Sequence, residues 1–257
     1  MGPAAAHEPV FGVGPETIYR GGIGVELGFD FDDLGEEGQD RILSSELIYG
    51  LTPDLSLTLE LPTLLHRRRG SRSSAGVGDV LLRGKYRFWN RNRLGSSDRA
   101  AWLFGVRFPT GAQQRRPALG SGGLDLLTGI SVAHESRRWY GFGTLRTVLR
   151  TRHQGLDRGE QILFDVAGGL RPWLTEYTEP DLVVLLEFNG EWAARDRRGG
   201  RRLRDTGGWL GWLGPTALLS YRNWMLKTGV QVPLASHLGG GQEEPDLRAL
   251  ASLEYHF

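Results

Sequence analysis

The sequence predicts an all-β fold, namely an up-and-down antiparallel transmembrane β-barrel of about 12 strands with short periplasmic turns and longer extracellular loops. Three observations lead to this prediction. Apolar and polar residues alternate in one segment after another, as they do in strands with two different faces. The connections between these segments are alternately short and long, and the aromatic residues gather near the segment ends.

The C-terminal stretch 246–257 has a clear two-residue period. One face consists of Leu247, Ala249, Ala251, Leu253, Tyr255 and Phe257, and the other of Arg248, Leu250, Ser252, Glu254 and His256. Only a β-strand separates side chains in this way. A terminal apolar strand that ends in Phe resembles the closing strand of bacterial outer-membrane barrels, which implies recognition by the barrel-insertion machinery.

Eleven further segments show strand patterns, and we find no sustained helical period. The segments are 17–31, 40–50, 55–61, 76–88, 102–108, 124–136, 138–151, 159–170, 181–192, 208–220 and 223–233. In 138–151 and 208–220 apolar residues occur on both faces, so the sequence does not decide which face of these two strands points to lipid.

The connections alternate in length as a closed meander requires. Short turns are expected near residues 52, 92, 137, 173 and 222, and longer loops at 32–39, 66–75, 110–123, 152–158, 194–207 and 234–245. An even strand number with both termini at the short-turn end fits the bacterial outer-membrane topology.

Aromatic residues near the short turns predict an interfacial girdle. Its expected members are Tyr49, Phe88, Trp102, Trp139, Trp224, Tyr255 and Phe257. The alternative is a soluble β-sandwich, whose buried core gives no reason for aromatic residues to concentrate at strand ends.

Composition excludes several classes of site and partner. The 257 residues contain no cysteine, so disulfides and thiolate metal sites are excluded, and the net charge of +1 gives no general attraction to nucleic acid. The mean hydropathy is −0.32, which does not argue against a barrel because lumen-facing residues dilute each strand. We expect residues 1–16 to be a periplasmic segment, either a vector-derived start or the remnant of a processed signal, and 17–257 to be the barrel domain.

Three short motifs resemble those of a known family. They are Leu-Thr-Pro-Asp-Leu-Ser-Leu at 51–57, Gly-Val-Gly-Asp at 76–79 and Val-Arg-Phe-Pro-Thr-Gly at 106–111. The chain resembles the outer-membrane β-barrels labelled as transporter-like or as belonging to the meta-pathway of phenol degradation. The resemblance implies a bacterial outer-membrane location and uptake or efflux of small solutes, often aromatic or hydrophobic. It supplies no functional residues.

The polar strand faces predict the residues that line the lumen. The candidates are Glu26, Asp30, Glu46, Glu60, Asp79, Arg83, Lys85, Arg87, Arg107, Asp125, Asp165, Glu187, Lys227 and Glu254. Arg83, Lys85 and Arg87 follow one strand face, where a basic row would favour anionic solutes. The other interpretation is an interior of ion pairs, with Glu46 and Glu60 as partners of the row.

The long loops are rich in arginine, especially at 67–72 and 195–204. On the outer surface such loops suit lipopolysaccharide phosphates, because the guanidinium group binds phosphate in a bidentate manner. They lack the aromatic residues that stack on nucleic-acid bases, so we expect no nucleic-acid partner. Solvated loops, or a closed barrel that displays loops to lipopolysaccharide or a partner, are the alternatives.

The sequence favours a channel or transporter over an enzyme, and no cofactor is expected. The candidate catalytic pairs are His134 with Ser131 or Ser136, and His256 with Ser252. A barrel hydrolase is therefore a weak alternative, because no Gly-x-Ser-x-Gly elbow occurs. The histidines show no metal-ligand spacing; His7 is a weak metal candidate that depends on processing after Ala6.

Overall fold

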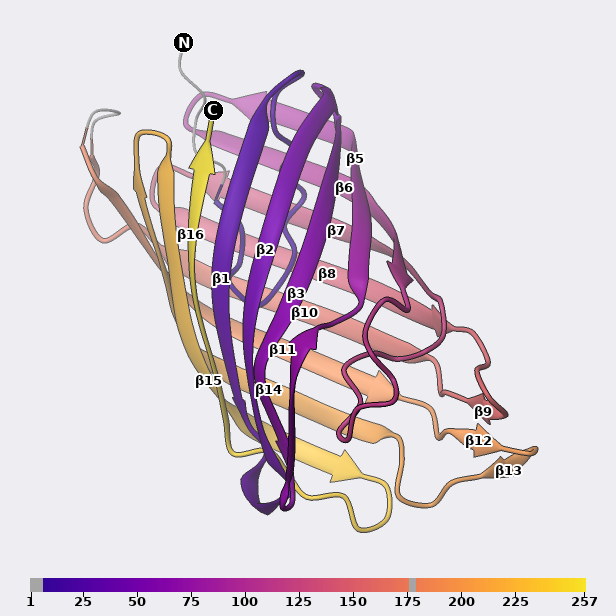
Figure 1. Cartoon of the computed structure of the whole chain (residues 1–257). Helices are drawn as coiled ribbons and strands as arrows, with labels where there is room; N and C mark the ends of the chain where they lie inside the picture. Colours follow the sequence, from indigo (N-terminus) through magenta and orange to yellow (C-terminus); the bar gives the residue numbers. More distant parts are fainter. Residues whose placement is uncertain (1–6, 176–178) are drawn as a thin grey trace.

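Twelve long antiparallel strands form a closed barrel in the computed structural model, which describes residues 7–175 and 179–257 (Figure 1). Each strand pairs with its neighbour in sequence, and β16 closes the barrel on β1, in a register that runs from Gly24 opposite His256 to Asp33 opposite Leu247. The strands are β1 (Ile23–Asp33), β2 (Gly38–Thr52), β3 (Leu55–Arg69), β5 (Val80–Arg93), β6 (Ser96–Phe108), β7 (Asp125–Ser136), β8 (Trp139–Arg150), β10 (Gln161–Leu170), β11 (Asp181–Ala193), β14 (Gly208–Tyr221), β15 (Trp224–Leu238) and β16 (Leu247–His256). The predicted fold class is confirmed.

The remaining elements lie at the long-loop end, opposite the chain termini (Figure 1). They are η1 (Gly35–Glu37), β4 (Arg72–Val77), which forms a hairpin with β3, and a small sheet of β9 (Leu156–Asp157), β12 (Arg197–Arg198) and β13 (Arg201–Arg202). Within the described ranges, no helix is long and apolar enough to span a membrane.

Several strands differ in length from the prediction. The first begins at Ile23 rather than at residue 17, because the chain turns at Gly21, whose φ is +76°, and its backbone bonds to Gly50. Strand β3 continues into the predicted basic loop. There Arg67 and Arg69 lie 3.0 and 2.7 Å from the Asp40 carboxylate of β2, and these ion pairs hold the hairpin together beyond the expected strand end.

The outer surface of the barrel is apolar. Leu27 on β1, Leu145 on β8 and Leu253 on β16 are 53%, 56% and 45% exposed, respectively. An apolar surface that runs around the whole barrel without protein cover is matched to lipid. Six members of the expected girdle, all but Tyr255, are between 45% and 64% exposed. The Tyr255 ring packs 4.5 Å from Trp224 and 4.8 Å from Phe257, measured between centroids.

The described part of the N-terminal region is residues 7–22; residues 7–18 run inside the barrel, and 19–21 are exposed (Figure 1). Of the predicted periplasmic segment 1–16, residues 1–6 lie outside the described residues and 7–16 contact the inner wall. An apolar cluster forms there from Val10, Ala133, Tyr140, Phe142, Ala167, Val183, Leu185 and Leu218. This cluster explains why β8 and β14 carry apolar residues on both faces: one set meets lipid, and the other packs inside the lumen.

Candidate functional site in the barrel lumen

The N-terminal segment, defined here as residues 7–22, is held by a carboxylate of the barrel wall. Glu187 of β11 is 1% exposed and accepts hydrogen bonds from the backbone N–H groups of Val10 (2.7 Å) and Phe11 (3.0 Å). Thr216 of β14 donates a third bond of 2.7 Å to the same carboxylate. Irregular backbone inside a barrel needs such partners, because each buried N–H without one costs free energy.

The next turn of the segment is bound through a backbone carbonyl. The oxygen of Val13 accepts hydrogen bonds from the hydroxyl groups of Ser131 (2.7 Å) and Thr144 (2.6 Å), on neighbouring strands β7 and β8. Both hydroxyl groups are buried. The wall therefore recognises the path of the backbone and not only its side chains.

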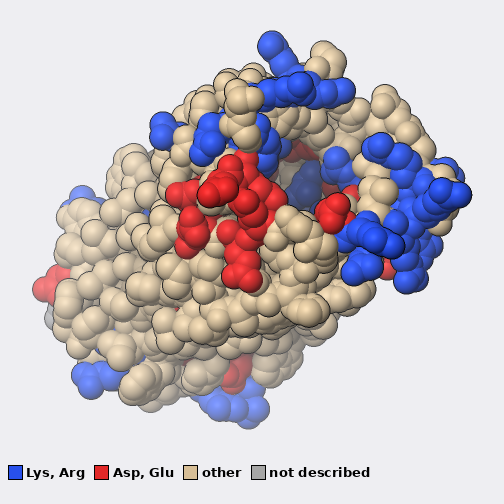
Figure 2. Space-filling model, turned by 90° about the horizontal axis from the view of Figure 1, so that it is seen from below, with Lys and Arg blue, Asp and Glu red and all other residues tan. Residues whose placement is uncertain are grey.

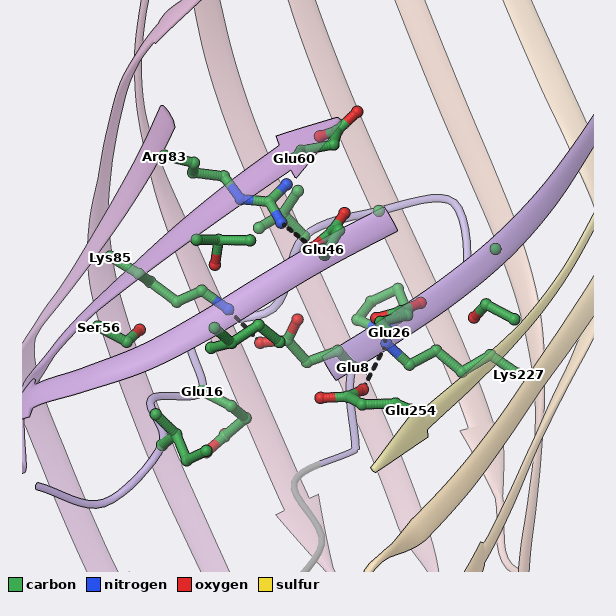
Figure 3. Close-up of a pocket in the computed structure, with 18 of the residues that line it drawn as sticks. Glu8, Glu16, Glu26, Glu46, Ser56, Glu60, Arg83, Lys85, Lys227 and Glu254 are labelled. Atoms are coloured by element: carbon green, nitrogen blue, oxygen red, sulfur yellow. Dashed lines mark hydrogen bonds and ion pairs between the residues drawn. The ribbon is translucent and has the colours of Figure 1, made fainter. Parts of the chain in front are cut away.

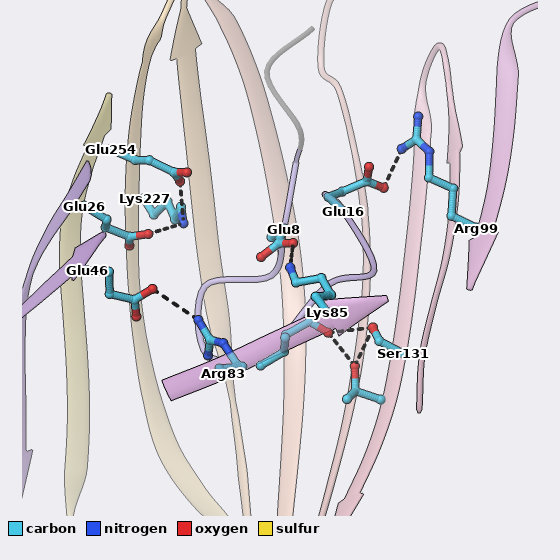
Figure 4. A network of polar contacts seen from close by, with 12 residues as sticks. Glu8, Glu16, Glu26, Glu46, Arg83, Lys85, Arg99, Ser131, Lys227 and Glu254 are labelled. Carbon is cyan, nitrogen blue, oxygen red and sulfur yellow. Dashed lines mark hydrogen bonds and ion pairs between the residues drawn. The ribbon is translucent and has the colours of Figure 1, made fainter. Parts of the chain in front are cut away.

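Charged side chains complete the docking, as Figure 4 shows. Glu8 forms an ion pair with Lys85 of β5, and Glu16 forms one with Arg99 of β6. The ring of Phe11 lies under the guanidinium of Arg248, 4.7 Å from the ring centroid. The segment thus contacts several sides of the barrel and narrows the lumen.

A cavity of about 550 Å³ remains between the segment and the wall formed by β1, β2, β3, β5, β15 and β16 (Figure 3). Seven carboxylates and five Lys or Arg cations line it. Seen from the long-loop end, the molecule is hollowed, with acidic and basic side chains inside (Figure 2). A cavity this polar is suited to hydrophilic groups of a solute.

Four glutamates form a row across one wall of the cavity, hereafter the glutamate row. Strand register places Glu254 of β16 opposite Glu26 of β1, Glu26 opposite Glu46 of β2, and Glu46 opposite Glu60 of β3. Like charges directly opposite each other on neighbouring strands are destabilising. The row therefore needs cations nearby.

Two cations neutralise part of the glutamate row. Lys227 of β15 lies 2.8 Å from both Glu26 and Glu254, and Arg83 of β5 lies 3.1 Å from Glu46 (Figures 3 and 4). Glu60 forms no ion pair with any residue in the part of the chain that the structure describes. Four carboxylates thus share two cations, and the His256 imidazole lies 2.5 Å from Glu254.

The basic row on β5 is compensated at every position. Arg83 pairs with Glu46 and Lys85 with Glu8, while Arg87 lies 2.9 Å from Asp54 in the first short turn. Of the two partners expected from the sequence, Glu46 makes the contact and Glu60 does not. These ion pairs remove the reason to expect an anionic solute at this row.

The other lumen candidates lie apart from the cavity, except Asp30, which lines it. Asp165 is 2.6 Å from Arg146 and accepts a bond from Asn189, and Asp125 is 3.5 Å from Arg107. Asp79 accepts backbone N–H bonds from Gly111 and Ser121, so it fixes the loop between β6 and β7.

None of the three candidate catalytic pairs is assembled. Ser131 is buried and bonded to the N-terminal segment, whereas His134 lies on the outer surface, 2.5 Å from Asp98. The hydroxyl of Ser136 donates a hydrogen bond to the backbone oxygen of Trp139. His256 lies 2.5 Å from Glu254, and the hydroxyl of Ser252 has no hydrogen-bond partner among the described residues.

His7 lies 3.3 Å from Asp181 and packs edge-on against the ring of Tyr140. Within residues 7–175 and 179–257, no group of three His, Asp or Glu side chains is arranged to hold a metal ion.

Sequence reasoning missed the docking residues of the N-terminal segment. Glu8, Val10 and Glu16 lie in a stretch with no strand or helix period, so nothing in their spacing indicated a binding role. The one sign of a segment inside the barrel was in the wall, where both faces of β8 and β14 carry apolar residues.

A closed antiparallel barrel with an apolar outside and a charged inside has the architecture of an outer-membrane β-barrel. Solved structures agree with this class. An outer membrane channel from Pseudomonas putida F1 superposes with a TM-score of 0.80 at 13% identity, over 98% of this chain and 100% of that chain. The NanC porin gives 0.56 at 9% identity, over 91% of this chain and 98% of that one.

LpxR from Salmonella typhimurium gives a TM-score of 0.53 at 10% identity, over 91% of this chain and 100% of that one. No protein-family model and no curated protein sequence matches the chain. At these identities the likeness concerns the fold.

Proposed function

We propose that the protein is a channel of the bacterial outer membrane that passes small solutes, and that its N-terminal segment narrows the lumen. The observation that carries the proposal is the charged cavity of about 550 Å³ inside a barrel whose outside is apolar. A barrel of about 12 strands is wider than its own side chains fill, since about eight strands already enclose a packed interior. The likeness to an outer membrane channel and a porin supports the same function.

The docking of the N-terminal segment supports a gated rather than a permanently sealed lumen. The segment is linked to the wall by hydrogen bonds and ion pairs, such as those of Glu187 and Lys85, in addition to the apolar contacts of Val10 and Phe11. Water can replace polar contacts of this kind at modest net cost, whereas a large apolar interface would resist opening. Displacement of the segment would join the cavity to the short-turn end.

The envelope supplies the remaining partners in this proposal. Lipid surrounds the apolar outer face, the insertion machinery recognises the strand that ends in Phe257, and lipopolysaccharide phosphates meet the arginines of the long loops. The motif resemblance adds a transporter-like protein for small, often aromatic or hydrophobic solutes. We propose no catalytic role.

A second candidate is a closed barrel that displays its loops to lipopolysaccharide or to a partner. It is favoured by the charge distribution at the long-loop end, where basic side chains gather at two sides of the mouth and acidic ones at another (Figure 2). Arginine-rich hairpin strands such as Arg197–Arg198 and Arg201–Arg202 project there.

Liposome swelling separates the two candidates. Vesicles that contain the folded protein are placed in isosmotic solutions of neutral solutes of increasing size. A channel admits the small solutes and excludes those larger than the cavity, so swelling falls with solute size. A closed barrel gives no swelling above that of protein-free vesicles, and this result would reject the channel.

A further inference from the structure

The cavity holds carboxylates that the protein itself does not neutralise. Glu60 ends the glutamate row without an ion pair to any described residue, and it lines the same cavity as the paired Glu26 and Glu46 (Figure 3). Asp30, two residues along β1 from Gly28, accepts a hydrogen bond of 3.2 Å from Ser44 and forms no ion pair within the described ranges. Both unpaired carboxylates line the cavity.

A hydroxyl group beside these carboxylates also lacks a partner. Ser252 of β16 is 3% exposed, lines the cavity, and has an Oγ atom without a hydrogen-bond partner among the residues described. In the strand register it lies opposite Lys227 and Gly28, two residues along β16 from Glu254 of the glutamate row. A buried hydroxyl oxygen of this kind is an acceptor for an N–H donor of a ligand.

Gly28 lets the hydroxyl of Ser44 approach the wall closely beside these acceptors. A Cβ atom at this position would lie 2.5 Å from the Oγ of Ser44, so no other residue fits without a shift of that hydroxyl. The neighbours of Gly28 across the sheet are Ser44 and Ser252, which are small and neutral. The wall beside the glutamate row is therefore lined by small side chains with oxygen acceptors.

The lining of the cavity is also partly apolar. Phe11 and Ile18 of the N-terminal segment contribute to it, and so do Ile48 of β2 and Leu250 of β16, on the strands that carry Glu46 and Glu254. A ligand that uses both kinds of lining has a cationic group with several N–H donors and an apolar body.

We infer that the cavity binds a small organic cation, an ammonium or guanidinium group joined to an apolar body, with Glu60, Asp30 and Ser252 as its polar contacts. The inference rests on the proposed channel function, for which it names the solute class. An anion is disfavoured, because Arg83 and Lys227 are already paired at 3.1 and 2.8 Å and the excess charge is negative.

The test measures binding of three probes of similar size and different charge to the folded protein in detergent. Isothermal titration with benzylammonium, benzyl alcohol and benzoate should give the highest affinity for benzylammonium and the lowest for benzoate. Glu60→Gln and Asp30→Asn should each weaken benzylammonium binding roughly tenfold, because each removes a charge that faces the ligand. Glu160→Gln, a matched change at an exposed carboxylate outside the cavity, should leave the affinity unchanged.

Equal affinities for the three probes, or a preference for benzoate, would overturn the inference, as would unchanged binding by both cavity variants. Heat-modifiability on gels identifies any variant that fails to fold, and the second cavity variant then decides. Swelling measured on the same preparation keeps the two proposals apart. Swelling without a preference for benzylammonium rejects the cation site and keeps the channel, whereas selective binding without swelling keeps the site and rejects the channel.

Discussion

Replacement of Glu187 by Gln should loosen the N-terminal segment. The carboxylate accepts the backbone N–H groups of Val10 and Phe11, one on each oxygen, at 2.7 and 3.0 Å. Glutamine has one acceptor oxygen, and its amide NH₂ would face an N–H donor. The Glu187→Gln variant therefore loses one bond and weakens the other by removing its charge.

The magnitude follows from these contacts. A hydrogen bond to a charged group contributes about 1.5–3 kcal/mol. A loss of about 2 kcal/mol in docking free energy lowers the equilibrium constant roughly 30-fold, since 1.4 kcal/mol corresponds to a factor of ten. Hydrogen exchange of the peptide that contains residues 7–16, measured by mass spectrometry on the detergent-folded protein, should show protection reduced by this factor.

Glu191→Gln is the matched control. Glu191 lies on the same face of β11, but its carboxylate contacts Gln161 rather than the N-terminal segment. The control should leave the protection of residues 7–16 unchanged. If Glu187→Gln left that protection unchanged, or if the control reduced it equally, the reasoning that Glu187 holds the segment would be refuted.

Three further predictions concern the row, the lipid face and pH. Lys227→Met should lower the unfolding free energy by about 3–5 kcal/mol, because it leaves the buried carboxylates of Glu26 and Glu254 without their cation. Urea titration in detergent measures this change, and an unchanged midpoint would show that Lys227 does not stabilise the glutamate row. Leu145→Arg should cost about 2–4 kcal/mol in lipid vesicles, whereas Leu94→Arg, in a fully exposed turn, should cost nothing measurable; equal costs would place the membrane elsewhere. Burial and the Glu135 carboxylate raise the pKa of Glu16 from 4.5 to about 7, so docking favours its protonated form. The stabilisation of the docked segment by protonated Glu16 is complete below pH 4.5 and is lost as the pH rises through 7. The hydrogen-exchange protection of residues 7–16, corrected for intrinsic exchange, should therefore fall over this pH range. Protection that rises with pH would contradict this prediction.

Strand positions and faces could be predicted because each depends on local spacing. The alternation in 246–257 identified β16 and its lumenal face, including Glu254, from residues two apart. The same argument placed Glu26, Glu46 and Glu60 on inward faces, where the cavity contains them.

That these glutamates lie directly opposite one another on neighbouring strands could not be predicted in the same way. It depends on register, which the turns and the bulge at Arg41/Ile42 set between β2 and β3. A shift of two residues would keep every face and separate Glu46 from Glu60. Spacing within one strand contains no information on this shift.

The position of the N-terminal segment in the lumen could not be predicted from residue patterns for a different reason. Residues 7–22 have no period, and their docking depends on three-dimensional complementarity with Glu187, Ser131 and Lys85, which come from three strands. The sequence contained only the indirect sign of lumenal apolar residues such as Phe142 and Leu218.

Single-channel recording in planar bilayers tests the central claim most directly, with the full chain compared with a variant that lacks residues 1–16. We predict small or infrequent conductance steps for the full chain and larger, longer-lived steps for the variant, because removal of the segment widens the lumen. Correctly folded and inserted protein that is silent in both forms would contradict the claim and favour a closed barrel that displays its loops.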